Sequence, residues 1–131
     1  MIIEIKIPNL QRFVSALGKA PTIVTKHINS AIEKSIYEVK QKSIYLTPVD
    51  TGKLARESNW RSDFRDMYGE LEPMATNPYG QKYAYWVHEG HQSYYGTPFL
   101  RAGVETAMPT VRSIFGRSLN DALNEIAQQS K

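Results

Sequence analysis

The amino-acid sequence predicts an α+β fold, in which a small antiparallel sheet packs with two long helices and a short N-terminal helix. Two segments, residues 3–7 and 60–64, alternate apolar and polar side chains, and this period of two is typical of half-buried strands. Two longer segments, residues 22–46 and the chain from Pro98 onward, repeat apolar residues at helical spacing. Helices that pack on an antiparallel sheet define the α+β class, so we expect both long helices to pack on the sheet.

The composition is that of a single globular domain spanning residues 1–131. Of the 131 residues, 41% are hydrophobic and 22% are charged, and both values are ordinary for such a domain. The chain has no cysteine, which excludes a disulfide framework and a thiolate metal site. No apolar run is long enough to cross a membrane. Glu4 stands where a signal peptide would have its apolar stretch, so we expect no targeting segment.

The charge balance does not indicate a nucleic-acid-binding protein. Sixteen Lys and Arg residues face thirteen Asp and Glu residues, which gives a net charge of +3 and a pI near 9.1. The basic residues are scattered along the chain, and Lys40 and Lys42 are the nearest approach to a cluster. We therefore interpret the small positive excess as a contribution to solubility.

The first third of the chain predicts a strand, a short helix and a long helix. Pro8 ends the strand, and residues 10–17 then place apolar side chains on one face of a short helix. Residues 22–46 have helical spacing throughout and would span roughly 37 Å at ~1.5 Å per residue. That is long for so small a domain, so we expect part of this helix to lack a cover within the chain. Its apolar stripe is Val24, Ile28, Ile32, Ser35, Val39 and Leu46, with Ala31, Ile36 and Ser43 beside it.

Residues 47–54 predict a tight corner between the long helix and the sheet. Pro48 ends the helix because it biases Thr47 out of the α region, and Gly52 tolerates a positive φ. The pair Gly52-Lys53 resembles part of a phosphate-binding loop. The consensus of that loop requires a second glycine, a preceding strand, and Ser or Thr where Leu54 stands. We therefore expect no nucleotide cofactor here.

The middle of the chain predicts two strands and one undecided segment. Residues 60–64 form the first strand, with Trp60, Ser62 and Phe64 on its apolar face. Residues 70–74 form a weaker second strand, and Pro73 places it at a sheet edge or bulge. Residues 83–87 predict either a third strand or one helical turn, because a short apolar run fits both.

The run His88-Glu89-Gly90-His91 is the nearest approach to a catalytic motif. A zinc protease places its two histidines four residues apart on a helix with glutamate between them, whereas these two are three residues apart and enclose Gly90. His27 stands alone on the long helix, where a packed or solvated role is far commoner than ligation. The chain has no GxSxG motif and no cysteine nucleophile. We expect no catalytic, cofactor or metal site, and alanine at His88, Glu89 or His91 should abolish no reaction and release no metal.

The end of the chain predicts the strongest helix. Thr97 supplies an N-cap hydroxyl, and Pro98 suits the first helical position, where no N–H is missed. Pro109 interrupts the pattern, so we expect a kink or a restart there. The apolar stripe is Leu100, Val104, Ala107, Met108, Val111, Ile114, Phe115, Leu119, Ala122, Leu123 and Ile126.

Two blocks of motifs occur in the chain in a fixed order. They are Ala20-Pro21, Pro48, Thr51-Gly52, Leu54 and Ser58, then Tyr83-Ala84, Val87, Glu89-Gly90 and Thr97-Pro98-Phe99-Leu100-Arg101-Ala102. Together they resemble the head–tail joining and tail-completion proteins of long-tailed bacteriophages, which are also called neck or minor tail proteins. The pattern of that family is P-x-x-T-G-x-L, then Y-A-x-x-V-E-x-G-T, then P-F-L-R-P-A before a final helix, and the resemblance covers nearly the whole chain. His91 replaces a threonine, Ala102-Gly103 replaces proline–alanine and His88 precedes the glutamate, which affects the loop's contacts.

The resemblance implies a non-enzymatic structural subunit with an antiparallel sheet and two helices. Proteins of this kind form rings, commonly of six copies, between the head connector and the tail tube, and DNA passes through the ring. Their genes also lie in bacterial prophages. The chain would then act in the neck or tail of a virion after assembly in the host cytoplasm.

We expect the subunit contacts at the loop of residues 90–96 and at the edge of the sheet. Tyr94 and Tyr95 are adjacent, so in an extended backbone one can pack inward while the other meets a partner. His91 lies in the same loop, and Pro73 marks the expected sheet edge. Aromatic residues are also enriched at interface cores.

Two other functions are weighed against the structural subunit. A small nucleic-acid-binding protein would use an aromatic platform interleaved with Lys and Arg. The stretch between Tyr83 and Leu100 contains neither Lys nor Arg. A small hydrolase would use His88, Glu89 and His91, although their spacing fits no standard site.

Overall fold

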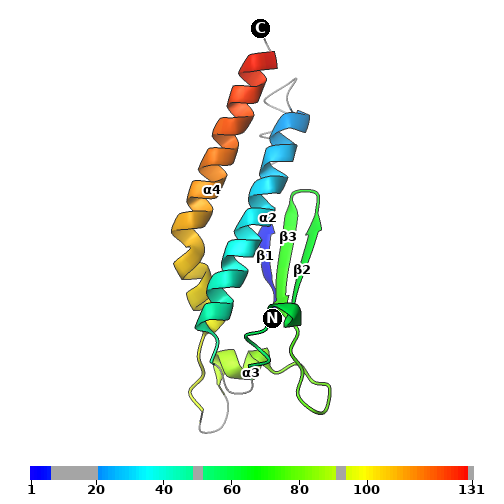
Figure 1. Ribbon diagram of the computed structural model, residues 1–131, viewed down its shortest axis with the longest axis vertical. Helices are drawn as coiled ribbons and strands as arrows, with labels where there is room; N and C mark the ends of the chain where they lie inside the picture. Colours follow the sequence, from blue (N-terminus) through cyan, green and yellow to red (C-terminus); the bar gives the residue numbers. More distant parts are fainter. Residues whose placement is uncertain (7–20, 49–51, 91–93, 130–131) are drawn as a thin grey trace.

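The computed structural model describes residues 1–6, 21–48, 52–90 and 94–129 and confirms the predicted α+β class (Figure 1). The strands form one antiparallel sheet, and the two long helices run side by side in opposite directions. The short helix predicted over residues 10–17 lies outside the described residues. The elements are β1 (Ile3–Lys6), α2 (Pro21–Leu46), the 3-10 helix η1 (Glu57–Asn59), β2 (Trp60–Arg65), β3 (Tyr68–Pro73), α3 (Ala84–Glu89) and α4 (Phe99–Gln129).

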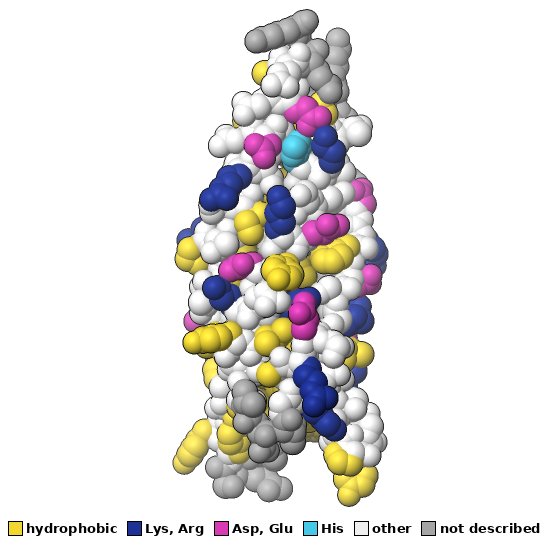
Figure 2. All heavy atoms as spheres, viewed as in Figure 1, with side chains coloured by type: hydrophobic (Ala, Val, Ile, Leu, Met, Phe, Trp, Pro, Cys, Tyr) yellow, Lys and Arg dark blue, Asp and Glu magenta, His cyan; other side chains and the backbone are white. Residues whose placement is uncertain are grey.

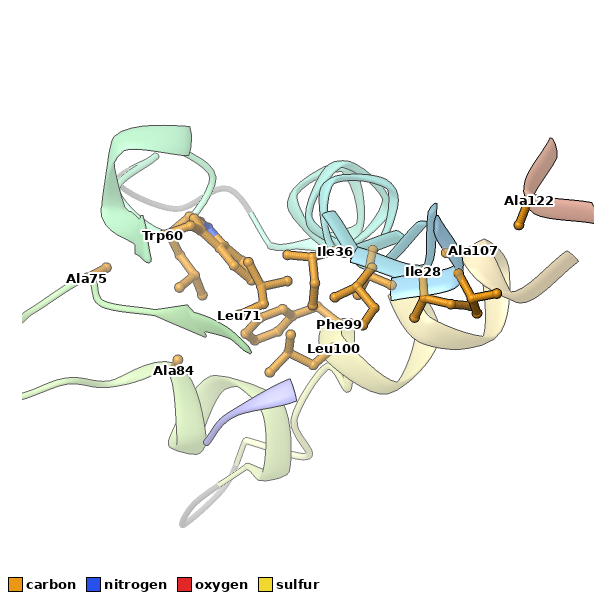
Figure 3. Close-up of a cluster of buried hydrophobic side chains, with 14 residues drawn as sticks. Ile28, Ile36, Trp60, Leu71, Ala75, Ala84, Phe99, Leu100, Ala107 and Ala122 are labelled. Atoms are coloured by element: carbon orange, nitrogen blue, oxygen red, sulfur yellow. The ribbon is translucent and has the colours of Figure 1, made fainter. Parts of the chain in front are cut away.

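Helix α2 is the middle layer, with α4 on one side and the sheet on the other (Figure 1). The apolar stripe predicted for this helix is the stripe that the fold buries, except that Leu46 is only partly buried. Burial of one such aliphatic side chain contributes about 1.5–3 kcal/mol, so α2 supplies a large part of the core (Figure 3). The fully or nearly fully buried members are Val24, Ile28, Ala31, Ile32, Ile36 and Val39.

The sheet has the strand order β1-β3-β2, and one of its faces meets α2. Ile3 lies opposite Leu71 and Ile5 lies opposite Gly69, and these residues share the face turned to the helix. A Cβ atom added at Gly69 would lie 2.7 Å from Cγ2 of Ile32. The helix therefore packs directly on the backbone of the central strand at this glycine.

The prediction that Pro73 marks a sheet edge is wrong, because β3 is the central strand. Pro73 is fully buried and lies opposite Trp60 of β2. The N–H of Met74 donates to the carbonyl of Asn59, so the backbone polar groups of Pro73 point to the other side, toward β1. The described β1 begins at Ile3, opposite Leu71. The pairing of β1 with β3 therefore does not extend to Pro73. A proline fits there because no residue of β1 requires its missing N–H donor.

The opposite face of the sheet is open and charged. Arg61 donates to Glu70 at 3.0 Å and to Glu72 at 3.1 Å, and Lys82 donates to Glu72 at 3.2 Å. The phenol of Tyr68 donates to Glu70, and this bond, together with the one from Arg61, lowers the pKa of the Glu70 carboxyl. Cross-strand ion pairs thus stabilise the side of the sheet that no described helix covers.

Strand β2 buries only the first of its three predicted inward residues. Trp60 is buried, its indole N–H donates to the carbonyl of Leu54 at 2.7 Å, and its ring meets the edge of Phe99 at 6.1 Å. Phe64 is 40% exposed and Ser62 is exposed. The two residues lie on the apolar face as predicted, but β2 is an outer strand and is open to solvent on its far side.

Helix α4 continues through Pro109 as one element, so the predicted restart does not occur. Proline removes one backbone hydrogen bond, the one that would reach the carbonyl of Glu105. Both Pro109 and Glu105 are exposed, so water can satisfy that carbonyl and the helix tolerates the loss. The predicted stripe is wider than the buried face, since Leu119 and Leu123 are 37% and 56% exposed.

The two long helices lie in close contact at Gly103 of α4 and Ser43 of α2. A Cβ atom added at Gly103 would lie 2.1 Å from Oγ of Ser43 and 2.8 Å from its Cα atom. Ser43 is fully buried, and Ala107, one turn further along α4, is also fully buried. Small residues at this level allow the helix backbones to approach, which places the N-terminus of α4 against the core.

An ion-pair cluster joins the helices at the other end of α2. Glu125 of α4 accepts hydrogen bonds from His27 at 2.6 Å and from Lys26 at 2.9 Å. The bond from His27, followed by the bond from Lys26, lowers the pKa of the Glu125 carboxyl. His27 is thus a helix-packing residue.

We expect alanine at Gly103 to destabilise the protein and alanine at Gly116 to stabilise it. At Gly103 the new methyl group forces α2 and α4 apart, which should lower the free energy of unfolding by about 1–3 kcal/mol. At Gly116 a Cβ atom meets no described atom within 4 Å, so Gly116→Ala should add about 0.5–1 kcal/mol through helix propensity. Urea denaturation of both variants checks this, and equal shifts would contradict the close contact.

The Glu125 cluster should make stability fall in acid. A folded-state pKa below the ordinary carboxyl value of about 4.3 means that the unfolded chain binds the proton more readily, so stability is lost as the pH falls through the carboxyl range. Glu125→Gln should lower stability at pH 7 and flatten its dependence between about pH 5 and pH 3. Asp121→Asn is the control, since Asp121 forms no ion pair with any residue that the structure describes. Parallel acid-unfolding curves for wild type and Glu125→Gln would count against this role.

Candidate interaction surface at the α3 end

The undecided segment before the loop is the short helix α3. Ala84 and His88 lie one turn apart and are both buried, while Tyr85 and Trp86 are 58% and 43% exposed. Gly90 ends the helix with a φ of +89°, and its N–H donates to the carbonyl of Trp86 at 2.8 Å. The segment is therefore not a third strand, because its buried positions recur at helical spacing.

Two glycines close the loop that follows α3. A Cβ atom at Gly90 would lie 2.5 Å from the carbonyl oxygen of Tyr94, and one at Gly96 would lie 2.7 Å from the carbonyl carbon of Glu89. Both have a positive φ, which glycine adopts at little cost. The N–H of Thr97 donates to the carbonyl of Val87 at 2.8 Å. The loop therefore starts and ends at one point on α3.

His88 connects α3 to the first turn of α4. Its side chain is 5% exposed, and its ring lies edge-on to Phe99 at 5.5 Å. The backbone N–H of Arg101 donates to Nε2 of His88 at 3.2 Å, so Nε2 is the acceptor and Nδ1 carries the proton that reaches Glu89 at 2.9 Å. Both ring nitrogens are thus used, and the histidine satisfies an N–H that the helix start leaves without a partner.

The hydrolase alternative finds no assembled site in the described residues. His88 is occupied as above, Glu89 also lies 3.9 Å from Arg101, and His91 lies outside the described residues. Within those residues no group of three His, Asp or Glu side chains is placed to hold a metal ion.

An apolar groove opens beside α3. It has a volume of about 560 Å³, and its walls come from the corner after α2, the loop after β3, α3 itself and the end of the 90–96 loop. Leu54 of the corner and Val87 of α3 supply apolar surface, and Tyr83 and Tyr94 supply aromatic surface. The described lining residues are Pro48, Gly52, Lys53, Leu54, Thr76, Asn77, Pro78, Tyr83, Val87 and Tyr94.

Exposed aromatic side chains surround this end of the molecule. We call them the aromatic end and define it as Tyr79, Tyr85, Trp86, Tyr94 and Tyr95, which are 88%, 58%, 43%, 41% and 99% exposed. In Figure 2 hydrophobic side chains project at the lower end of the face, where α3 lies in Figure 1, and others are scattered among acidic and basic side chains over the rest of the face. A monomer that keeps large aromatic side chains in water presents a surface typical of a binding site.

The two adjacent tyrosines have different surroundings, although both are exposed. Tyr94 lines the groove, and its hydroxyl lies 2.8 Å from Oγ1 of Thr97. Tyr95 is almost fully exposed. Of the other two candidate contact residues, His91 lies outside the described residues, and Pro73 is buried in the central strand and cannot meet a partner.

Sequence reasoning did not place the corner of residues 47–54 in this site. The corner and α3 are about thirty residues apart in the chain, and their contact depends on the path of β2 and β3 between them. The signal that could have found it is the resemblance itself, since its two motif blocks contain Pro48 and Leu54 on one side and Tyr83 and Val87 on the other. The structure places all four on the wall of one groove.

Comparison of the chain with protein-family models, curated proteins and solved structures finds no match. Among the described residues, no helix has both the length and the apolar character of a membrane-spanning segment.

We expect His88→Ala to destabilise the protein by about 2–3 kcal/mol. The change removes a buried ring and the acceptor for the Arg101 N–H. His88→Gln should recover part of this loss, because its amide oxygen can accept the same hydrogen bond. Amide exchange at Arg101 should speed up in the alanine variant and slow again in the glutamine variant. Unchanged exchange in both would show that His88 does not cap α4.

Proposed function

We propose that this protein is a structural subunit of the head–tail joint or of the completed tail end of a long-tailed bacteriophage or prophage. It would assemble with copies of itself into a ring between the head connector and the tail tube, through which DNA passes. It would act in the virion neck or tail after assembly in the host cytoplasm. The ordered motif blocks motivate this proposal, and the aromatic end with its groove is the observation that carries it.

The aromatic end supports a function based on contacts between proteins. Tyrosine and tryptophan are enriched at interface hot spots because each offers a large rigid surface with a polar group at its tip. Tyr95 and Tyr79 are 99% and 88% exposed, so they have almost no packing role within the described chain. A contact with a partner protein explains these exposed tyrosines better than a role in folding does.

A groove next to projecting aromatic side chains suits a head-to-tail contact. In such a contact one subunit presents a concave patch and its neighbour presents a different, protruding patch, and repetition by a closing rotation gives a ring. The groove beside α3 is the concave patch, and Tyr95 is the most exposed protruding side chain. Each contact can be weak in isolation, because ring closure gives every subunit two neighbours.

The elongated shape fits a subunit that joins two larger parts. The α3 end and the C-terminal end of α4 lie at opposite ends of the long axis (Figure 1). A ring of such subunits could therefore present different surfaces to the head and to the tail.

The test is a Tyr94→Ala, Tyr95→Ala double variant in a phage or prophage that encodes this chain. We expect the protein to fold, because both side chains are more than 40% exposed, while full heads and free tails accumulate unjoined. The yield of infectious particles should fall by about tenfold or more, as expected for loss of aromatic interface residues. Electron microscopy of lysates and plaque counts provide the measurement.

The matched control is Leu123→Ala, which removes an exposed apolar side chain near the opposite end of the molecule. It should leave particle yield unchanged. The single variant Tyr95→Ala separates loss of contact from loss of stability, since Tyr95 is 99% exposed. A folded double variant that gives normal particle yield would refute the aromatic end as the joining surface.

A further inference from the structure

Strand β2 forms an outer edge of the sheet, and in the described structure it pairs only with β3. Four of its six residues, from Ser62 to Arg65, are exposed, and it lies at the outer side of the sheet away from α4 (Figure 1). An open strand of this length is a template for pairing with another strand.

The outward backbone groups of β2 belong to its even-numbered residues. The N–H of Met74 donates to the carbonyl of Asn59, and Arg61 and Asp63 lie opposite Glu72 and Glu70. Because backbone polar groups alternate between the two sides of a strand, the odd-numbered residues bond to β3. The N–H and C=O groups of Ser62 and Phe64 therefore point away from the sheet. The C=O of Trp60 points the same way, while its N–H bonds to the carbonyl of Glu57.

The edge carries charges of alternating sign. Arg61, Asp63 and Arg65 follow one another on the open face of the sheet. Edges that exclude partners commonly carry charged side chains, a proline or a bulge. Strand β2 contains neither a proline nor a bulge in its pairing with β3, and its charges alternate in sign, so a second copy can match them. Asp63 is 53% exposed, and its ion pair with Arg61 is long at 3.7 Å. Its carboxylate can therefore accept a partner from outside.

We propose that β2 pairs with β2 of a second copy of this chain, antiparallel and about a two-fold axis at Ser62. The two sheets then join into one continuous sheet across the axis. Ser62 lies opposite the partner's Ser62 and exchanges both backbone hydrogen bonds with it, and the N–H of Phe64 donates to the C=O of the partner's Trp60. Arg61 meets the partner's Asp63, and by symmetry Asp63 meets the partner's Arg61.

Charge selects this register over its neighbours. A slip of two residues in either direction keeps the even-numbered residues paired and moves the two-fold axis to Asp63 or Arg61. It then places Asp63 opposite Asp63 or Arg61 opposite Arg61, and like charges directly opposite are destabilising. A slip of one residue would pair even-numbered with odd-numbered residues, and it would put open-face side chains opposite core-face side chains. A longer slip toward the turn would pair Asp63 with Arg65, but it leaves Trp60 and Arg61 with no residue opposite.

The core side of the strand fits the same register. Phe64 is 40% exposed on the face that meets α2. In the proposed pair it lies opposite the partner's Trp60, whose ring is buried in its own core. The strand of the second copy then covers part of the apolar side chain that the chain's own helices leave half-exposed.

This contact goes beyond the proposed function and does not depend on it, because it uses β2 and not the aromatic end. The two ideas fail separately: Tyr94→Ala with Tyr95→Ala should leave the β2 contact unchanged, and loss of the β2 contact says nothing about the groove.

A single cysteine tests the register. The chain has no cysteine, so Ser62→Cys introduces one thiol, which faces its symmetry mate at a Cα separation of about 5.5 Å, within disulfide range. Mild oxidation of the purified full chain should give a disulfide-linked dimer. Ser113→Cys, at an exposed position on α4, is the matched control and should cross-link at least about tenfold more slowly. Equal rates for the two variants would overturn the proposal.

Charge reversal tests the interaction itself. Asp63→Arg places Arg opposite Arg61 at both symmetry-related pairs and should raise the dimer dissociation constant by about tenfold or more in sedimentation experiments. Asp121→Arg on α4 is the matched control and should leave the constant unchanged. Mixing Asp63→Arg with Arg61→Asp should restore dimers, because both crossed pairs become Asp with Arg. Arg61→Asp also removes the hydrogen bonds from Arg61 to Glu70 and Glu72. Circular dichroism therefore first checks that this variant is folded.

Three results would each overturn the proposal. The first is a wild-type chain that stays monomeric up to about 1 mM, the upper range of weak specific pairing. The second is a dimer that Asp63→Arg does not weaken. The third is an oligomer in which Ser62→Cys gives no cross-link, which would place the contact elsewhere, for example between β1 and β2 in a head-to-tail ring.

Discussion

The close contact between α2 and α4 at Ser43 and Gly103 is the constraint on which the rest of the structure depends. A Cβ atom at Gly103 would lie 2.1 Å from Oγ of Ser43, so the helices can approach only because the residue is glycine. This approach holds the first turn of α4 against the sheet, where Phe99 meets Trp60. The core is therefore shared among both long helices and the sheet, although α4 itself packs mainly on α2.

The α3 end follows from that placement. Once the first turn of α4 is fixed, His88 can accept the N–H of Arg101 and anchor α3, and Gly90 and Gly96 can close the loop on α3. Apolar residues are buried on the inner side of this small helix, while Tyr85 and Trp86 remain exposed on its outer side. The same contacts that hold α3 in place leave its aromatic side chains exposed. In the assembly that we propose, such a preorganised surface would lower the cost of binding.

Much of the fold could be predicted because its signals are local. The period-two segments became β1 and β2, and the helical stripes became α2 and α4, since alternation and the 3.6-residue repeat depend only on neighbours in the chain. His27 was interpreted as a packed or solvated residue, and it has a hydrogen-bond partner within the described chain. The burial of His88 against the start of α4 was not predicted.

The sequence by itself determined the types of the long elements, the buried face of α2 and the glycine-bounded loop, because each is a property of spacing or of backbone freedom. It left the type of α3 undecided. Only the tertiary structure decided the strand order, and with it the fate of Pro73. The sequence shows that Pro73 has no N–H to donate, but it does not show whether an adjacent strand would need that donor. Here the pairing of β1 stops at Leu71 and does not extend to Pro73. The groove is also a tertiary property, since residues 47–54 and α3 meet through the path of the sheet between them. The exposed edge of β2 exists because β3, between β1 and β2, became the central strand.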